Sequence, residues 1–127
     1  MNSQIAIISL GPSLDRSTNA QLLNKVRSAL TDKKFLVLDA LELNFLDSAG
    51  VGQLFAIVNL TVQNSGDIAI IGANPQIKAL FTLVQLDRIA HICPDLVVAM
   101  ELLRPSAPEF ATHRTSPLQS SPGVAVG

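Results

Sequence analysis

The chain has 127 residues, of which 48% are hydrophobic and only 15% are charged, and its formal net charge is −1. This composition suits one domain with a core of its own, and it gives no general attraction to nucleic acid or to an anionic membrane surface. Because the chain contains neither Trp nor Tyr, it also lacks the aromatic surface on which nucleic-acid bases stack.

Strand-like and helical patterns alternate along the first half of the chain. Residues 5–10 form a short apolar run rich in β-branched side chains, which predicts a strand that ends at Gly11. Thr18 and Gln21 stand at the spacing of a capping box, so we expect a helix to begin there. The apolar face of this helix is predicted to comprise Leu22, Val26 and Leu30. Residues 35–39 are apolar on both faces and predict a central strand.

The second half continues the alternation. Residues 67–72 predict a buried strand, and Asn74 followed by Pro75 predicts a helix cap with proline at the first helical position. The apolar face of that helix is expected to comprise Ile77, Leu80, Phe81 and Val84. Residues 89–92 indicate a last short strand, and Pro94 is expected to open a helix with the apolar residues Leu96, Met100 and Leu103. The whole pattern predicts an α/β domain with a mainly parallel mixed sheet and about four helices.

Two further features define the domain and its setting. Residues 105–127 are rich in Pro, Ser and Thr, which predicts a disordered tail after a domain of residues 1–104. The single cysteine, Cys93, leaves no partner for a disulfide and no cysteine pair for a zinc or redox motif. No apolar stretch is long enough to span a bilayer, and no targeting segment is recognisable. We therefore expect a cytoplasmic protein with no membrane insertion, no metal and no cofactor.

The most informative stretch is residues 45–52, Phe-Leu-Asp-Ser-Ala-Gly-Val-Gly, between a strand-like segment and a helical pattern. The inner face of that helix is predicted to comprise Val51, Leu54, Phe55, Val58 and Val62, and the helix should end near residues 64–66. Asp47 or Ser48 could simply cap the helix. Alternatively, Ser48 presents a short hydroxyl where Gly50 and Gly52 keep the surface low, and another protein's active site could reach it.

Three other roles for Ser48 fit the sequence poorly. A hydrolase nucleophile needs a glycine two positions earlier and a histidine base, but Leu46 precedes it and both histidines have simpler explanations. His91 lies in a predicted strand and His113 in the tail. A phosphopantetheine carrier domain is a helical bundle, whereas strands flank this motif. A phosphoaspartate receiver needs an acidic cluster at the strand ends that this chain lacks.

Residues 38–52, Leu-Asp-Ala-Leu-Glu-Leu-Asn-Phe-Leu-Asp-Ser-Ala-Gly-Val-Gly, resemble the signature of the anti-sigma factor antagonists, bacterial members of the STAS domain family. That signature is a strand ending in Asp or Asn, a short link, an apolar pair, and Asp-Ser-(Ser/Thr/Ala)-Gly-(Leu/Val)-Gly opening a helix. The resemblance extends over residues 5–103 and implies a STAS fold. Many relatives carry an additional strand before the one expected at residue 5, so the sheet edge here could be exposed to self-pairing.

The resemblance also implies a function without catalysis. In that family an anti-sigma factor with serine kinase activity phosphorylates the serine after the aspartate, and a metal-dependent phosphatase reverses the reaction. By motif position the phosphoacceptor is Ser48, and the unphosphorylated form binds the kinase and thereby releases a sigma factor. The partner-binding residues implied are Asp15, Asp39, Asp47, Ser48, Ala49, Gly50 and Gly52.

Simpler roles remain open for some of these residues. Asp15 could cap a turn or the first helix, and Asp39 could cap the end of a strand. STAS domains also serve as unmodified adaptor subunits of lipid-transport or stress-signalling assemblies. In that alternative, Ser48 need not be phosphorylated.

Overall fold

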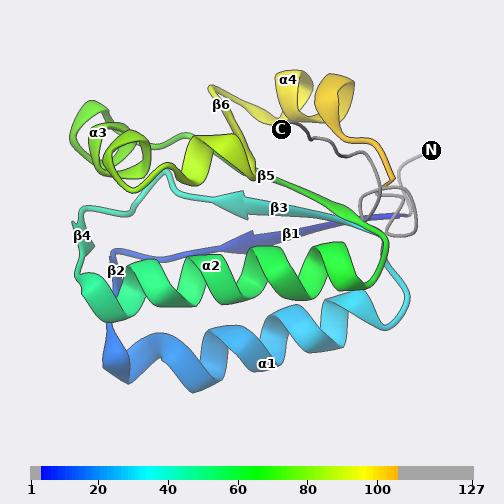
Figure 1. The fold of residues 1–127 in the computed structure, drawn as a ribbon, viewed down its shortest axis with the longest axis horizontal. Coiled ribbons are helices and arrows are strands. Elements are labelled where there is room, and N and C mark those ends of the chain that lie inside the picture. The colour runs from blue at the N-terminus through cyan, green and yellow to red at the C-terminus, as the bar shows by residue number, and fades with distance from the viewer. Residues whose placement is uncertain (1–3, 106–127) are drawn as a thin grey trace, which may run out of the picture.

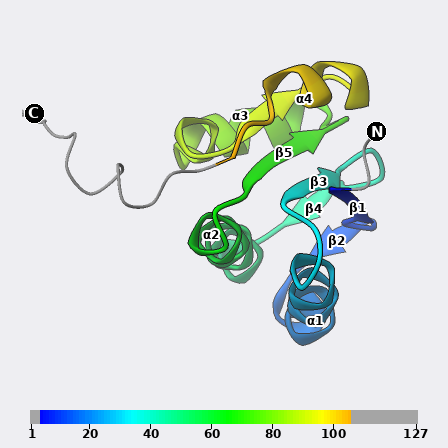
Figure 2. The ribbon, with the colours of Figure 1, turned by 90° about the vertical axis from the view of Figure 1, so that its right-hand side faces the viewer.

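The computed structural model describes residues 4–105 and shows a parallel sheet between two layers of helices (Figures 1 and 2). The predicted tail from residue 106 onward lies outside the described residues. The sheet has the strand order β1-β3-β5-β6, and every described strand pair is parallel. Its strands are β1 (Ile5–Ser9), β3 (Phe35–Asp39), β5 (Asp67–Ile71) and β6 (His91–Cys93).

Four α-helices and two single-turn 3-10 helices accompany these strands, and all but the last helix lie between successive strands of the two sheets. The α-helices are α1 (Asn19–Leu30), α2 (Ser48–Gln63), α3 (Pro75–Leu83) and α4 (Leu96–Leu102), and the 3-10 turns are η1 (Arg16–Thr18) and η2 (Leu86–Arg88). Alternating strands and helices connected in this way produce parallel pairing, because each helix carries the chain back across the sheet. The predicted fold class, an α/β domain with a mainly parallel sheet and four helices, is confirmed.

A second, very small sheet was not predicted from the sequence. It pairs β2 (Ser13–Leu14) with β4 (Phe45–Leu46) in parallel, with Leu14 opposite Leu46. The backbone of Asn44 also donates to the carbonyl of Pro12 at 2.9 Å. These contacts join the segment after β1 to the segment that leads into α2, so two loops distant in the sequence lie side by side at the carboxyl end of the sheet (Figure 1).

The alternation of side chains along β3 divides the core between the two faces of the sheet. Leu36 and Leu38 are fully buried on the face covered by α1 and α2, whereas Val37 is fully buried on the face covered by α4. A central parallel strand is apolar on both faces for this reason, as predicted for residues 35–39. At the edge of the sheet, Ile7 of β1 is 54% exposed.

The inner face of α2 differs in part from the prediction. Leu54 and Val58 are buried as expected. Ile57 and Thr61 are also buried, although they were not predicted to lie on the inner face, whereas Val62, which was predicted to lie there, is 36% exposed. The difference arises because α2 is apolar on several sides, with only short polar breaks, so the spacing of its apolar residues is compatible with more than one inner face.

Three element boundaries also differ from the prediction. Thr18 precedes α1 but makes no side-chain cap, because its hydroxyl instead completes a capping box with Asp15 around η1. Strand β6 begins at His91, later than expected, because the preceding residues continue from the η2 turn. Helix α4 is capped by Asp95, whose carboxylate accepts from Val98 N, so Pro94 precedes the cap and does not open the helix. Met100, which was expected on the apolar face of this helix, is 38% exposed.

Candidate functional site

Ser48 is the first residue of α2, and its side chain is exposed. The cap of this helix is Asp47: its Oδ1 accepts from the backbone N–H of Gly50 at 2.9 Å, and its carbonyl accepts from Val51 N at 2.9 Å. The Ser48 hydroxyl makes no hydrogen bond to any of the described residues. Of the two possible caps in the sequence, Asp47 therefore performs the structural role, and Ser48 is left with a free hydroxyl at the positive end of the helix.

The two glycines of the motif have different surroundings. A Cβ added at Gly50 would lie 2.3 Å from the carbonyl oxygen of Leu14, closer than side chains are found in proteins. Gly50 is buried, and it allows α2 to approach the backbone of β2, where Asp47 N also donates to Leu14 O at 3.4 Å. A Cβ added at Gly52 would meet nothing within 4 Å. Gly50 is thus required by packing inside the domain, whereas Gly52 faces open space.

Asp15 lies in the turn that follows β2, and it organises that turn. Its Oδ1 accepts from the backbone N–H of Ser17 at 2.9 Å and from the Ser17 hydroxyl at 2.6 Å. The hydroxyl of Thr18 accepts from Asp15 N at 3.1 Å, which completes the capping box. The hydrogen bond from the Ser17 side chain is the main reason that the pKa of Asp15 is lowered below its ordinary value.

A residue that sequence reasoning missed, Gln53, connects this turn to α2. Its side-chain Nε2 donates to the carbonyl of Asp15 at 3.1 Å, across 38 residues of sequence. Gln53 is only 3% exposed, and apart from Thr61 it is the one buried polar side chain of the described core. Its long polar side chain within the apolar stretch after Gly52 is the signal that could have identified it.

Asp39 ends β3 and is half-buried at the same carboxyl edge of the sheet. Its Oδ1 accepts from the backbone N–H of Leu41 at 2.9 Å, so it caps the strand end, as one of the two sequence interpretations proposed. The structure therefore holds the Asp15 turn near the start of α2 through two neighbouring residues: Leu14 contacts Asp47 and Gly50, and Gln53 contacts Asp15. Asp39 shares the edge but, among the described residues, makes no hydrogen bond to this group.

The family model of the STAS domain matches residues 1–99. The chain belongs to the STAS domain family. The membership expected from the Asp-Ser-Ala-Gly motif is thereby confirmed, and the match covers the strands, the motif and α2 as well as most of α4.

Solved structures with the same fold include anti-sigma factor antagonists. A putative anti-sigma factor antagonist from Thermotoga maritima, TM1081, superposes with a TM-score of 0.71 at 21% identity, over 78% of this chain and 86% of that chain. The anti-sigma factor antagonist SpoIIAA in its unphosphorylated form gives 0.66 at 19% identity, over 80% and 90%. The Bacillus protein SpoIIAA in its phosphorylated form gives 0.60 at 19% identity, over 77% and 89%. At these identities the likeness shows a shared fold.

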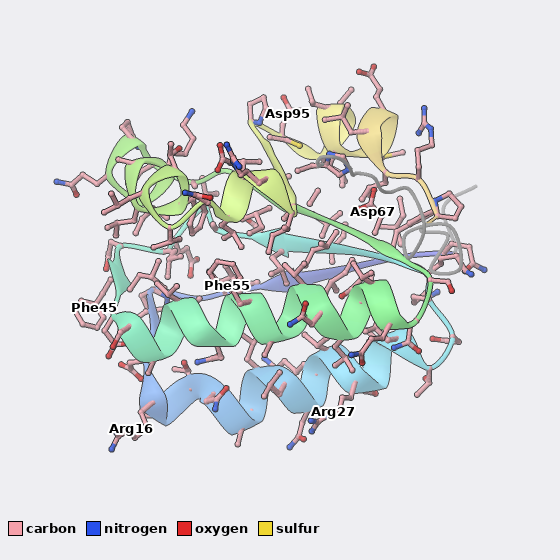
Figure 3. All side chains as sticks on the ribbon, in the orientation of Figure 1. Arg16, Arg27, Phe45, Phe55, Asp67 and Asp95 are labelled. Atoms are coloured by element: carbon pink, nitrogen blue, oxygen red, sulfur yellow. The ribbon has the colours of Figure 1, made fainter. Side chains whose placement is uncertain are left out.

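Apolar side chains are exposed in the segment that leads into Ser48 and on α3 of this STAS domain. Phe45 of β4 is 51% exposed and Leu80 of α3 is 37% exposed. They line a hollow of about 450 Å³ between β4 and α3, to which Leu46 and Ile77 also contribute. Figure 3 shows Phe45 and Arg16 at the end of the molecule where α2 begins. The surface around Ser48 thus combines apolar side chains with carboxylates, a composition suited to contact with another protein.

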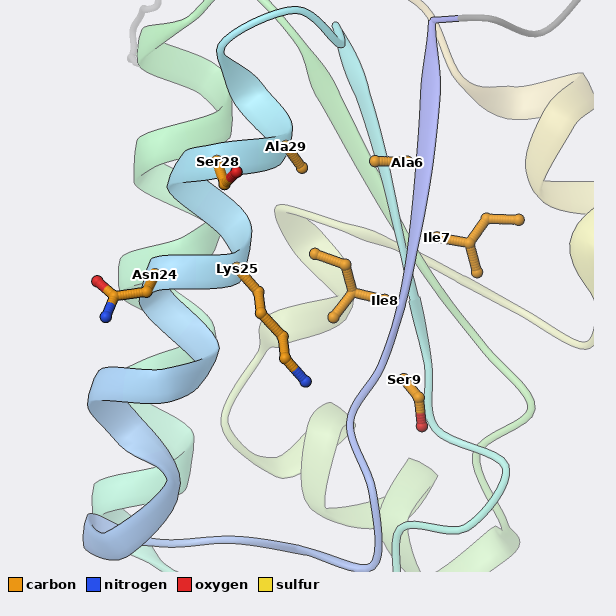
Figure 4. Close-up of a pocket in the computed structure, with 8 residues that line it drawn as sticks. All are labelled: Ala6, Ile7, Ile8, Ser9, Asn24, Lys25, Ser28 and Ala29. Atoms are coloured by element: carbon orange, nitrogen blue, oxygen red, sulfur yellow. The ribbon is translucent and has the colours of Figure 1, made fainter.

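A larger hollow, of about 730 Å³, lies elsewhere, between β1 and α1 (Figure 4). Lys25 is the one charged side chain among the described residues that line it, and Ala6 and Ile8 form part of its apolar wall. No acid, histidine or cysteine lies among these lining residues, so they provide no general acid, base or nucleophile pair of the usual kinds. This hollow is therefore not the candidate site, despite its size.

The structure also bears on other chemical roles. The Nε2 of His91 lies 2.8 Å from Oδ2 of Asp67, so this histidine has a partner within the fold and is not paired with Ser48. Within residues 4–105, no three His, Cys, Asp or Glu side chains are grouped so that they could hold a metal ion. In the same range, no helix combines the length and the apolar character that crossing a membrane requires.

Proposed function

We propose that this STAS domain is an anti-sigma factor antagonist that acts as a noncatalytic partner switch. Unphosphorylated, it binds an anti-sigma factor serine kinase, and the sigma factor held by that kinase is released. The kinase phosphorylates Ser48, and a metal-dependent serine phosphatase restores the free hydroxyl. The observation that carries the proposal is the free, exposed hydroxyl of Ser48 at the first position of α2, beside a separate cap residue, Asp47.

The position of the cap explains why phosphorylation would leave the fold intact. Asp47 already satisfies the Gly50 amide, so modification of Ser48 removes no hydrogen bond of the helix end. A phosphoserine carries about −1.5 to −2 charges at pH 7. Negative charge at the first turn of a helix is favoured by the helix dipole and by the free backbone amides there. The change would consequently be concentrated at the surface.

At an interface, the same charge would be unfavourable. The phosphate would stand beside the Asp47 carboxylate and next to the exposed Phe45, on a surface that meets the partner while Ser48 is neutral. Unpaired like charges at a desolvated contact cost several kcal/mol, and about 1.4 kcal/mol is already a tenfold loss of affinity. Phosphorylation would then release the partner through the interface alone, without refolding.

The proposed partner surface consists of the Asp15 turn, the first two turns of α2 and the hollow between β4 and α3. Asp47, Ser48, Ala49 and Gly52 lie on the α2 part, and Gly52 leaves room for a partner's backbone. Asp39 lies at the rim, where its carboxylate already caps the strand end. ATP would be bound by the kinase, and we assign no cofactor to this chain.

The test is the affinity of the protein for candidate anti-sigma factor serine kinases from the same cell, measured by calorimetry before and after stoichiometric phosphorylation of Ser48. The proposal predicts binding that weakens at least tenfold on phosphorylation, with an unchanged circular dichroism spectrum. Equal affinity of the two forms would reject the switch. Recovery of a transporter or a large scaffold in pull-downs, with no kinase, would instead favour an unmodified adaptor.

A further inference from the structure

Gln53 occupies an unusual position for a long polar side chain. It lies in the second turn of α2, faces the interior and is 3% exposed. Nε2 of its amide donates to the carbonyl oxygen of Asp15 at 3.1 Å. Oε1 of the same amide is buried and meets no hydrogen-bond donor among the described residues. One half of the amide therefore has a partner, and the other half is left unpaired.

This arrangement lowers stability locally. Burying a polar atom without a hydrogen bond costs more than a single hydrogen bond returns, so a half-satisfied amide is a poor core residue. A methionine of similar length would fill the space with no unpaired oxygen. The packing of α2 thus does not explain the glutamine, but its contact with Asp15 does.

The contact joins two parts of the proposed partner surface that lie far apart in the sequence. Ser48 and Asp47 belong to α2, whereas Asp15 belongs to the turn after β2. The other ties between these segments are the short β2–β4 pairing, the 3.4 Å hydrogen bond from Asp47 N to Leu14 O, and the close approach of Gly50 to Leu14. All of these contacts are made to Leu14 or to residues that precede it in the sequence. The Gln53 amide is the one described side-chain hydrogen bond from α2 that reaches beyond Leu14, to the turn itself.

We propose that Gln53 is a positioning residue that holds the Asp15 turn against the phosphoacceptor helix, so that Asp15 and Ser48 meet the partner as one rigid surface. The inference rests on the proposed function for the identity of the partner. The effect on the mobility of the turn concerns this chain alone: without the Gln53 amide, the Asp15 turn moves more freely relative to α2.

The test compares Gln53→Met with Thr61→Val in the full-length protein. Thr61 is the other buried polar residue of the described core; its hydroxyl donates to Ile57 O at 2.8 Å within α2, away from the turn. Thr61→Val therefore controls for loss of a buried polar group. The first readout is hydrogen exchange at the amides of Ser17 and Thr18, which donate to Asp15 Oδ1 and Asp15 O. The second is affinity for the anti-sigma factor serine kinase.

In Gln53→Met, we expect exchange at these two amides to be about tenfold faster and the affinity to fall about tenfold, equivalent to ~1.4 kcal/mol each. The melting temperature should equal or exceed that of the wild type. Thr61→Val should change neither readout. Unchanged exchange and affinity in a folded Gln53→Met would overturn the inference, as would an equal effect of Thr61→Val.

Two further outcomes separate the causes of failure. If Gln53→Met does not fold, Gln53→Leu is measured in the same way, and the same results decide the question. If the wild-type protein binds no kinase, the proposed function fails. The exchange of Ser17 and Thr18 then still decides whether Gln53 holds the turn.

Discussion

Gly50 and Gly52, two glycines in the first two turns of α2, are expected to respond oppositely to replacement by alanine. At Gly50, the new Cβ would lie 2.3 Å from Leu14 O, 2.8 Å from Leu46 Cδ1 and 2.9 Å from Leu14 C. Two of these atoms belong to the backbone of β2, which cannot rotate away as a side-chain end can. Helix α2 and strand β2 must therefore separate to admit the methyl group.

The cost of that separation can be estimated. Overpacking a filled core costs ~1–3 kcal/mol, and loss of the hydrogen bond between Asp47 N and Leu14 O adds ~0.5–1.5 kcal/mol. The higher helix propensity of alanine returns ~1 kcal/mol. We therefore expect Gly50→Ala to lower the free energy of unfolding by about 2 kcal/mol.

Gly52→Ala is the matched control, because its Cβ would meet nothing within 4 Å and the position is exposed. Only the propensity gain remains, so this variant should be more stable than the wild type by ~1 kcal/mol, or about 4–8 °C in melting temperature. Urea unfolding followed by circular dichroism should separate the two variants by roughly 3 kcal/mol.

The same pair also distinguishes folding from partner binding. If a partner's backbone approaches Gly52, the added methyl should weaken kinase binding at least tenfold in a protein that is more stable than the wild type. Equal stability of the two alanine variants would refute the assigned packing of Gly50. Full kinase affinity in Gly52→Ala would refute the role of Gly52 in the interface.

Three further outcomes follow from the structure. Asp47→Ala should lower the free energy of unfolding by ~1 kcal/mol in urea titrations because it removes the cap of α2. Asp47→Asn should retain most of the stability that the cap contributes, because an asparagine side chain can accept the same hydrogen bond. Cys93 is 4% exposed, and burial raises the pKa of its thiol; intact-mass measurements should show slow alkylation by iodoacetamide in the native protein and rapid alkylation in urea, and rapid native alkylation would contradict its burial. The pKa of Asp15 is lowered in the folded state, so its contribution to stability is present above the unfolded pKa and is lost as the pH falls through the folded value. The melting temperature of the wild type should thus fall more between pH 5 and pH 2 than that of Asp15→Asn; parallel curves would show that the hydrogen bonds from Ser17 do not favour the charged form.

The sequence was sufficient for those elements whose signals are local. Asn74 followed by Pro75 specifies a cap and a first helical position through side-chain and backbone chemistry alone, and Asn74 Oδ1 accepts from Ile77 N at 2.8 Å. The strand at residues 35–39 was predictable because a strand covered on both faces must be apolar throughout. The beginning of α2 followed from the Asp47-Ser48 pair, although the sequence could not decide which of the two residues caps it.

Features that depend on contacts between distant segments were not predictable in this way. Strands β2 and β4 have two residues each, too few to show any periodicity, and they exist because the two segments meet. The different roles of Gly50 and Gly52 depend on where Leu14 lies. Gln53 was missed for the same reason, since its partner, the Asp15 carbonyl, lies 38 residues away.

Intact-mass analysis shows directly whether Ser48 is the phosphoacceptor of a partner switch. The purified protein is incubated with ATP and each candidate anti-sigma factor serine kinase from the same cell, with Ser48→Ala as the control. The assignment of Ser48 as the phosphoacceptor predicts one added phosphate on the wild type and none on the variant. A folded wild type that gains no phosphate with any of these kinases, or equal modification of Ser48→Ala, would contradict it.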